Sequence, residues 1–452
     1  MSIQETLAWQ PGTTEETPLP PLVDPHELAG GEDLFLRYYQ KLGPVFRVPR
    51  RHKMLTVLAG PEVNVFMARY EDEFFSTREQ WEDFDAVLGS KIAGARDGQA
   101  NRQRRAQSSK SYSRARVLDQ LPQMMEITRE FSRWQAGESF PVRPTMQRLI
   151  AEQLGRLLVG FGPGDYLPDL ITYLDTAIMT SLGLEDERHE WTPEAEDALQ
   201  HAKIRTYELA GAIVQAHLKH PMPNGKPDMI DEALAEAAKN PGPNAQRRAG
   251  GAAIGPFLAG LDTVANTCSF MIYALLDNPA VLKRVLDEVD AVFAGGPLTW
   301  ELLKNMTALH GAAMETLRRY PVAGGHMAKV AKPLTLAGYR LEPGDDIYIA
   351  MTVPHFLPEL YPDPEKFDID RFHAPRNEHR QRGAYAPFGL GDHTCLGAGI
   401  AEVQLMVTIA TIFHDYTLEL DPPSYTLTIE YAPTPAPGKD FHVKAIAKRD
   451  GA

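Results

Sequence analysis

Cysteine is scarce in this chain: its only two cysteines, Cys268 and Cys395, lie far apart in the sequence. Their number and separation exclude a disulfide framework and the paired-thiol spacing of a zinc site, and they favour a reducing cytoplasm. Basic residues are fewer than acidic ones, and the formal net charge is -14. This charge argues against a general nucleic-acid binder. The N-terminal stretch lacks a basic start, a signal-peptide apolar core and a membrane-spanning run. We therefore expect no export signal and no transmembrane segment.

The remaining composition is that of a globular protein. Hydrophobic residues make up 43% and charged residues 23% of the 452 residues, which is far from the composition of disordered chains. Single cores usually stop growing at about 250 to 300 residues, so we expect one globule with two sub-regions, or two domains. The polar, proline-rich residues 1–30 are expected to form a surface arm ahead of one domain over 31–452.

Hydrophobic periodicity predicts a mainly α fold with small β-sheets. Apolar runs at 45–48 and 54–59 flank a basic turn and predict a β-hairpin. The pattern is helical from 62 to about 319, and it includes a long apolar helix over 248–276 that ends before Pro279. The later elements expected are a strand at 334–341, a strand at 346–351, a helix at 396–413 and strands in the tail. The β-rich parts are thus expected near 44–60, 330–352 and 416–449.

The most informative string is PFGLGDHTCLGAGIAEVQL at 387–405, in which a glycine-rich loop places Cys395 just before a helix. Gly389 and Gly391 allow positive φ and a close approach to a flat ligand. Amides and the dipole at the helix start favour a thiolate. Phe388 is placed to cover the sulfur, and Gly397 leaves room for a macrocycle. The alternative is a buried structural cysteine after a glycine turn, the commoner fate of a lone cysteine.

This string resembles the F-x-x-G-x-x-x-C-x-G signature of the cytochrome P-450 family, with His393 where that family places Arg or His against a haem propionate. The resemblance implies the cytochrome P-450 fold, an α-rich body with a smaller β-rich region. It also implies haem b with Cys395 as the axial ligand of the iron. The thiolate donates electron density to iron, which favours O–O cleavage and insertion of one oxygen atom from O2 into a C–H bond.

A second motif is METLRRYP at 314–321, where Glu315 and Arg318 share one helix face. An isolated pair of this kind is usually a solvated surface pair worth about 0.2–0.5 kcal/mol. The string resembles the family's E-x-x-R helix, and Arg371 in PEKFDIDRF stands where the family's second arginine is expected. The resemblance implies a structural triad of Glu315, Arg318 and Arg371 that fixes the helix to the segment before the cysteine loop.

The third motif is AGLDTVAN at 259–266, which resembles the family's A-G-x-D/E-T segment over the distal face of haem. Ala259 and Gly260 would form a small wall for dioxygen, and Asp262 with Thr263 would relay protons. The alternative is a helix whose polar side chains bond the preceding turn. Pro256 removes a helix hydrogen bond and is expected to kink the helix.

A fourth feature is a basic cluster with seven Arg or Lys residues between 96 and 116. Its ordinary interpretation is a solvated helix face. In the family a helix here clamps the propionates with a His or Trp and an Arg four residues later; this chain has Asn101 and Arg105 at those positions. The other basic residues are expected to dock an acidic ferredoxin or flavodoxin. The further propionate contact that the family places after its E-x-x-R helix has two candidates, His326 and Lys329.

The resemblance implies an apolar substrate pocket and separate electron donors. The predicted pocket residues are Trp81, Phe84, Val87, Leu88, Phe257, Leu258, Val322, Ala323 and Tyr431. These suit a hydrophobic small molecule. No length is left for a fused redox domain, so a ferredoxin or flavodoxin with its reductase is expected. The alternatives are a haem-thiolate peroxygenase or isomerase, which needs no external electrons, and a non-catalytic haem sensor or carrier.

Overall fold

The protein is represented by a computed structural model that describes residues 7–24, 34–50, 53–79, 97–109, 111–181, 192–239, 241, 243–296 and 298–449. It divides into two compact units. The first unit comprises Met1–Glu82, Ala95–Gln107 and Leu317–Cys395, and the second comprises Asp83–Gly94, Ser108–Thr316 and Leu396–Ala452.

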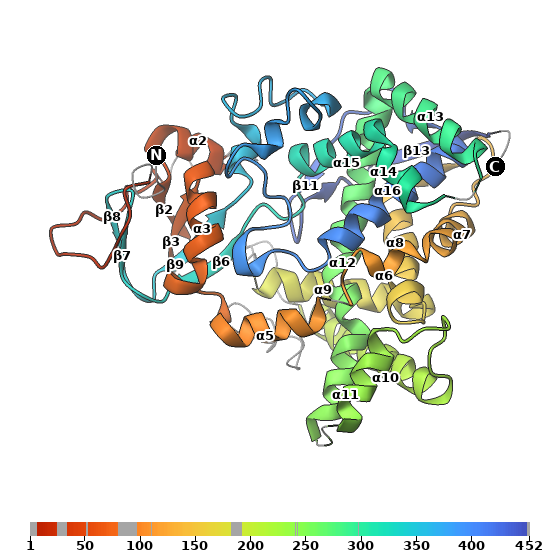
Figure 1. Ribbon diagram of the computed structural model, residues 1–452, viewed down its shortest axis with the longest axis horizontal. Coiled ribbons are helices and arrows are strands. Elements are labelled where there is room, and N and C mark those ends of the chain that lie inside the picture. The colour runs from red at the N-terminus through yellow and green to blue at the C-terminus, as the bar shows by residue number, and fades with distance from the viewer. Residues whose placement is uncertain are drawn as a thin grey trace. The chain divides into compact units, whose positions relative to one another are not determined.

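The first unit is built on a five-stranded sheet with the order β2-β3-β9-β6-β4 (Figure 1). Its strands are β2 (Val45–Arg50), β3 (Lys53–Ala59), β9 (Asp346–Ala350), β6 (His326–Val330) and β4 (Phe75–Ser76). The predicted hairpin is confirmed: β2 and β3 are antiparallel, from Val45 opposite Leu58 to Arg50 opposite Lys53. The remaining elements are α2 (Leu34–Leu42), α3 (Pro61–Phe74), α5 (Gly98–Ser108), β1 (Gln10–Pro11), β7 (Leu334–Leu336), β8 (Tyr339–Leu341) and four short 3-10 helices.

Both faces of this sheet are buried, which explains its apolar runs. Successive side chains of a strand point to opposite faces. Phe46 and Val57 therefore pack in one cluster with Tyr38 of α2, whereas Leu58 and Phe66 belong to a second cluster with α3. The central pairing of β3 with β9 is parallel, as is usual for strands covered on both sides.

The N-terminal segment contributes to this core rather than lying only on the surface. Leu7 and Val23 are buried, and the Trp9 ring lies 5.3 Å from that of Phe66 and 4.6 Å from that of Tyr70. Gln10–Pro11 pairs with β7. Burial of these few apolar side chains fixes a segment whose average composition is polar.

The strand expected over 334–341 is instead a hairpin of β7 and β8. Its turn residues, Ala337 and Gly338, have φ values of 52° and 81°. Two successive positive φ values define the tight turn that suits the twist of paired strands. The sequence pattern missed the turn because alanine seldom adopts this conformation.

The second unit is mainly helical. Its helices are α6 (Ala115–Leu118), α7 (Leu121–Phe131), α8 (Val142–Leu158), α9 (Leu167–Ser181), α10 (Pro193–Lys219), α11 (Met229–Lys239), α12 (Pro243–Asp277), α13 (Pro279–Ala294), α14 (Trp300–Asn305), most of α15 (Thr307–Arg319) and α16 (Ala398–Asp415). Small sheets join β10 (Tyr416–Asp421), β13 (His442–Lys448) and β5 (Ser139–Pro141), and β11 (Ile429–Glu430) with β12 (Ala436–Pro437). The predicted α-rich body and tail strands are confirmed.

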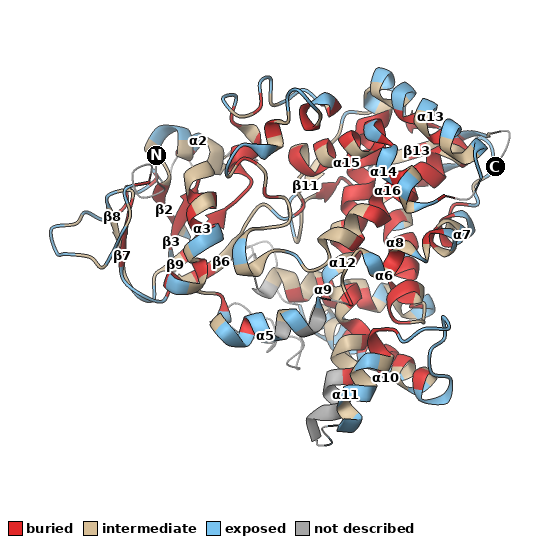
Figure 2. Cartoon of the chain, in the orientation of Figure 1, coloured by how far each residue is buried: buried red, intermediate tan, exposed pale blue. Residues whose placement is uncertain are grey.

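The long helix α12 runs through the interior of the second unit, and α8 and α11 pack against it. It continues on both sides of Pro256, and Pro279 begins α13 as expected. Residues Ala249–Asp277 are long and apolar enough to span a membrane, but 78% of the most apolar stretch is buried inside the protein. This burial, visible with that of α16 in Figure 2, is typical of a core helix.

Candidate haem-thiolate site

Two hydrogen bonds within the first unit close the loop that carries Cys395. The Cys395 amide donates to the Phe388 carbonyl at 2.7 Å, and the Thr394 hydroxyl donates to the Gly391 carbonyl at 2.8 Å. Gly389 and Gly391 have φ values of 75° and 63°, as the sequence led us to expect. A Cβ atom on Gly391 would lie 3.2 Å from the Met67 carbonyl oxygen of α3. Glycine is therefore required there both by conformation and by space.

The two cysteines differ in their surroundings. Cys268 is fully buried in α12, and burial raises the pKa of its thiol, so it is an inert core residue. Cys395 is exposed. Three residues further along the chain Ala398 begins α16, with Gly397 as the N-cap. Exposure ahead of a helix start is typical of a cysteine that binds a metal or reacts.

Helix α5 contacts the backbone of the cysteine loop through two side chains one helical turn apart. The Arg105 guanidinium donates to the Thr394 carbonyl, and the Asn101 amide donates to the Asp392 carbonyl at 3.3 Å. Burial lowers the pKa of Arg105, while the nearby Cys395, Asp392 and Glu71 oppose this shift. Arg105 thus lies close enough to the Cys395 thiol for their charges to interact.

Two histidines lie beside the loop in the same unit. The ring centroids of His326 and His393 are 6.4 Å apart, and His326 Nε2 lies 2.6 Å from Glu71 Oε1. Burial lowers the pKa of His393, and the nearby His326 and Arg105 lower it further, against the opposing charge of Glu71. Lys329, the other candidate for the further propionate contact, pairs with Glu79 at 2.9 Å. Both candidates thus have an acidic partner, and His326 is the one that lies beside His393 of the cysteine loop.

The residues gathered here fit an iron porphyrin. An exposed thiol supplies the soft, anionic donor that binds iron in haem-thiolate proteins. Arg105, His326 and His393 supply hydrogen-bond donors suited to carboxylates. The first unit alone thus provides a thiol ligand for the iron and hydrogen-bond donors for the carboxylates of a porphyrin.

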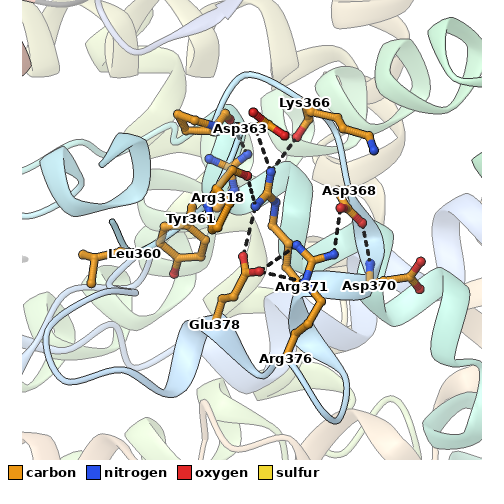
Figure 3. Close-up of polar contacts among 12 residues, drawn as sticks. Arg318, Leu360, Tyr361, Asp363, Lys366, Asp368, Asp370, Arg371, Arg376 and Glu378 are labelled. Carbon is orange, nitrogen blue, oxygen red and sulfur yellow. Dashed lines mark hydrogen bonds and ion pairs between the residues drawn. The ribbon is translucent and has the colours of Figure 1, made fainter. Parts of the chain in front are cut away.

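Arg318 and Arg371 organise the segment that precedes the loop (Figure 3). Both side chains are fully buried. Arg318 donates to the carbonyls of His355 and Pro364 at 2.7 Å each. Glu315 lies one turn before Arg318 on α15 and is also fully buried. The triad as a whole remains a prediction, but the burial of all three residues excludes the solvated surface pair.

Arg371 has an acidic partner that the sequence pattern did not reveal. It donates to the carbonyls of Pro362 and Asp363 at 2.7 Å each and to Glu378 Oε2 at 3.0 Å. In Figure 3, dashed lines join Glu378 to both Arg371 and Arg376. This carboxylate neutralises a buried guanidinium, which would otherwise be costly.

His355 connects this arginine network to the cysteine loop. Its Nδ1 donates to the Arg318 carbonyl at 3.2 Å, and its Nε2 accepts the Ala386 amide at 3.0 Å. Its ring stacks on Tyr385 with centroids 5.3 Å apart. Because Nε2 accepts a backbone N–H, the imidazole is neutral. Burial and the Arg318 charge lower its pKa to about 3.

The AGLDT segment lies in the middle of α12. Within residues 253–275, all of which the structure describes, Ala259 alone is exposed. A Cβ atom on Gly260 would lie 3.2 Å from the Leu154 methyl groups, so this glycine also permits close packing of α8. The Thr263 hydroxyl donates to the Ala259 carbonyl at 3.0 Å. This is the backbone bond that the alternative interpretation of the motif predicts.

Asp262 faces the helices that pack on α12. It is buried, and its Oδ1 accepts a hydrogen bond of 2.7 Å from the Gln147 amide of α8. It also interacts with Asp175 of α9. Burial first, and then the charge and hydrogen bond of Asp262, raise the pKa of Asp175 to about 7. Neither Gln147 nor Asp175 belongs to a recognisable motif, so the sequence could not reveal them.

Comparison with known proteins identifies the family. The cytochrome P-450 family model matches residues 26–438. The chain belongs to the cytochrome P-450 family.

Relatives among curated cytochromes P-450 match over part of their length. A probable cytochrome P-450 6a13 of Drosophila melanogaster is 38% identical over 164 residues, 35% of this chain and 33% of that protein. Cyclooctat-9-en-7-ol 5-monooxygenase of Streptomyces melanosporofaciens is 36% identical over 155 residues, 34% of each protein. Thromboxane-A synthase of Mus musculus is 30% identical over 233 residues, 51% of this chain and 40% of that protein. The matched segments thus span roughly a third of these relatives' length.

Solved structures share the fold over nearly the whole chain. A cyanobacterial cytochrome P-450 with retinoic acid bound superposes with a TM-score of 0.81 at 23% identity, covering 96% of this chain and all of the other. The haem domain of cytochrome P-450DA gives a TM-score of 0.80 at 19% identity and covers 96% and 97% of the two chains. The predicted cytochrome P-450 fold is confirmed.

The basic cluster of this cytochrome P-450 is partly neutralised within each unit. Arg102 pairs with Asp72 and Asp392 in the first unit. Arg114 pairs with Glu402, and Arg116 lies 3.4 Å from Glu232, in the second unit. These pairs leave less unpaired positive charge for an electron donor than the sequence alone suggested.

The predicted pocket residues of this cytochrome P-450 fall into three groups. Trp81, Phe84, Val87 and Leu88 lie outside the described residues. Phe257 is fully buried, and Leu258 packs against a cluster of the second unit that includes Tyr173. Val322 is buried, Ala323 is exposed and Tyr431 is 45% exposed. A substrate pocket built from these residues therefore stays a prediction.

Proposed function

We propose that this cytochrome P-450 is a monooxygenase that inserts one oxygen atom from O2 into a hydrophobic small molecule. The observation that carries the proposal is the loop of the exposed Cys395 ahead of α16. The Cys395 amide bonds the Phe388 carbonyl, and Asn101 and Arg105 of α5 bond the carbonyls of Asp392 and Thr394 in the same loop. The name of the Streptomyces relative, a monooxygenase, supports the same reaction class. The retinoic acid in the cyanobacterial structure supports an apolar substrate.

The residues take the following roles in this proposal. Cys395 binds the iron of haem b as a thiolate, with Gly389, Gly397 and Phe388 beside it. Arg105, His393 and His326 bind the haem carboxylates. Bound haem supplies oxygen activation and the insertion of one oxygen atom. The side chains of Asp262 and Thr263 hold and move protons next to Ala259 and Gly260, and Gln147 fixes the orientation of Asp262.

The proposal includes separate electron donors and a cytoplasmic location. A ferredoxin or flavodoxin, served by its reductase, would supply the electrons one at a time. The mostly buried α12 supports an aqueous location, because its apolar surface is already covered by the protein.

The test is the absorption spectrum of the reduced, carbon-monoxide-bound holoprotein. We expect a strongly red-shifted Soret band in the natural protein and in Cys268→Ala, and its loss in Cys395→Ser. The Cys268 variant is the matched control, because it removes the buried cysteine and keeps the exposed one. A histidine-type spectrum in all three proteins would contradict the proposal.

A second candidate is a peroxygenase or isomerase that needs no external electrons. The Thr263 hydroxyl favours it, because its proton is already engaged in a hydrogen bond to the Ala259 carbonyl. Oxygen consumption distinguishes the two. A monooxygenase consumes O2 only with an electron donor, whereas this alternative converts its substrate without one.

A further inference from the structure

Two carboxyl groups of the second unit interact: the buried Asp262 of α12 and the half-buried Asp175 of α9. Asp262 is 1% exposed. Asp262 Oδ1 accepts the Gln147 amide at 2.7 Å. The remaining oxygen, Asp262 Oδ2, and Asp175 Oδ1 are both buried and receive no hydrogen bond from a protein donor among the described residues.

One proton held by the pair supplies a donor that these carboxyl groups lack. An ionised carboxylate only accepts hydrogen bonds, so two ionised groups in contact would repel each other and leave both oxygens without a donor. A single proton turns the contact into a charge-assisted hydrogen bond, the strong kind. The Gln147 amide holds Asp262 Oδ1 as an acceptor, which directs the proton to the Oδ2 side of Asp262.

The charged surroundings of the pair do not remove the need for this proton. The positive charges of Arg143 of α8 and Lys439 of the segment before β13 lower the pKa of Asp175. Their effect on this pKa is smaller than the opposing effects of burial and of Asp262. Arg205 and His201 of α10, which packs on α9, lie next to Asp169 instead. Asp175 is more exposed than Asp262, so it lies on the side of the pair from which solvent supplies protons.

We propose that Asp175 and Asp262 share one proton and that Asp175 is a positioning residue that keeps Asp262 supplied with it. When Asp262 gives the shared proton to an acceptor near Thr263, both carboxyl groups are left ionised; solvent then reprotonates Asp175, and that proton is again shared with Asp262. No electrons move in this step. The supply role rests on the proposed function, whereas the shared proton does not.

The first test measures the proton itself. Infrared difference spectra of the purified holoprotein, recorded against pH, report the C=O stretch of a protonated carboxyl group. We expect one such group at pH 6 that ionises near pH 7, where the pKa of Asp175 lies. It should be absent from Asp175→Asn and from Asp262→Asn. It should persist in the control Asp169→Asn, which removes an α9 carboxylate that lies beside Arg205.

Two results would overturn the shared proton: no protonated carboxyl group in the natural protein at pH 6, or the same group retained in Asp175→Asn. If Asp175→Asn fails to fold, Asp262→Asn makes the same test, because either change removes one half of the pair.

Stability against pH gives a second, independent readout. The folded-state pKa of Asp175 lies above its unfolded value of 3.8, so the folded protein binds this proton more tightly. Stability should fall as the pH rises from about 4 to 7 and then level off. Each unit of difference between the folded and unfolded pKa changes the folding equilibrium constant about tenfold. Between pH 4 and 7 this constant should therefore fall by at most about 10³-fold. Asp175→Asn should show a correspondingly flatter profile, and an unchanged profile would overturn the proposal.

The supply role has its own test. With electrons provided, O2 consumption by the natural protein should decline above pH 7, while that of Asp175→Asn should not follow this profile. Identical profiles would overturn the supply role. Absence of a thiolate spectrum would instead overturn the proposed function and leave the infrared result standing.

Discussion

His355 should make the stability of this protein sensitive to acid. The imidazole is fully buried, donates to the Arg318 carbonyl and accepts the Ala386 amide, and its pKa is about 3 against an ordinary 6.5. Because the folded-state pKa is depressed, the neutral form is fully stabilising above about pH 6.5. The contribution is lost as the pH falls toward 3, where the buried ring must take up a charge.

The magnitude follows from the two pKa values of His355. A difference of about 3.5 pH units corresponds to about 5 kcal/mol at roughly 1.4 kcal/mol per unit. Most of it should be lost between pH 6.5 and 4. This is comparable with the entire stability of many domains, about 5–15 kcal/mol.

The assay is denaturant unfolding at a series of pH values for the natural protein and His355→Gln. Glutamine does not titrate, and its side-chain oxygen can accept the Ala386 amide in place of Nε2. We expect the variant to lose about 1–3 kcal/mol at pH 7, because the stacked ring and one buried hydrogen bond are gone. Between pH 6.5 and 4 its free energy of unfolding should fall less steeply than that of the natural protein.

Comparison with an exposed histidine isolates this effect from the other histidines. His220 is exposed at the end of α10, so His220→Gln should reproduce the natural pH profile. Parallel profiles for the natural protein and His355→Gln would refute the reasoning, because they would mean that His355 accepts a proton without cost.

Two further predictions concern Arg371, in the segment before the cysteine loop, and Gly391, in the loop itself. Arg371→Lys should lower the free energy of unfolding by about 3–5 kcal/mol, because an ammonium group cannot replace the planar guanidinium that bonds two carbonyls and Glu378. The control Arg380→Lys, at an exposed position, should leave this free energy unchanged. An equal effect of the two variants would contradict this. Gly391→Ala should cost about 1–2 kcal/mol from its φ of 63° and more from the Met67 carbonyl, and should lower haem content. Gly344→Ala, with a φ of 95° and open space around it, should show the conformational cost alone.

Features encoded by neighbouring residues could be predicted from the sequence. The hairpin at 45–59, the long helix α12 and the glycine loop before Cys395 each follow from patterns within about 30 residues. The positive φ values of Gly389 and Gly391 are of this kind, because only glycine adopts them without strain.

Contacts between distant residues could not be predicted in this way. Asp175 lies in an ordinary amphipathic helix, and nothing near it in the sequence indicates that it meets Asp262. His355 looks like any histidine in a proline-rich segment until folding brings Arg318 and Ala386 to its two nitrogens. Trp9 stands in a polar stretch, and its burial depends on the rings of α3. In each case tertiary packing decides a role that local composition leaves open.

The way in which the loop is held bears on how its cysteine can be tested. Asn101 and Arg105 bond the carbonyls of Asp392 and Thr394. His355 bonds the Ala386 amide, and the Cys395 amide bonds the Phe388 carbonyl. All four contacts use backbone atoms of the loop, so they do not depend on which side chain residue 395 carries. Cys395→Ser should therefore keep the loop conformation and the unfolding free energy of the protein without haem. Loss of the red-shifted band in that variant would then report the missing thiolate itself and not a collapsed loop.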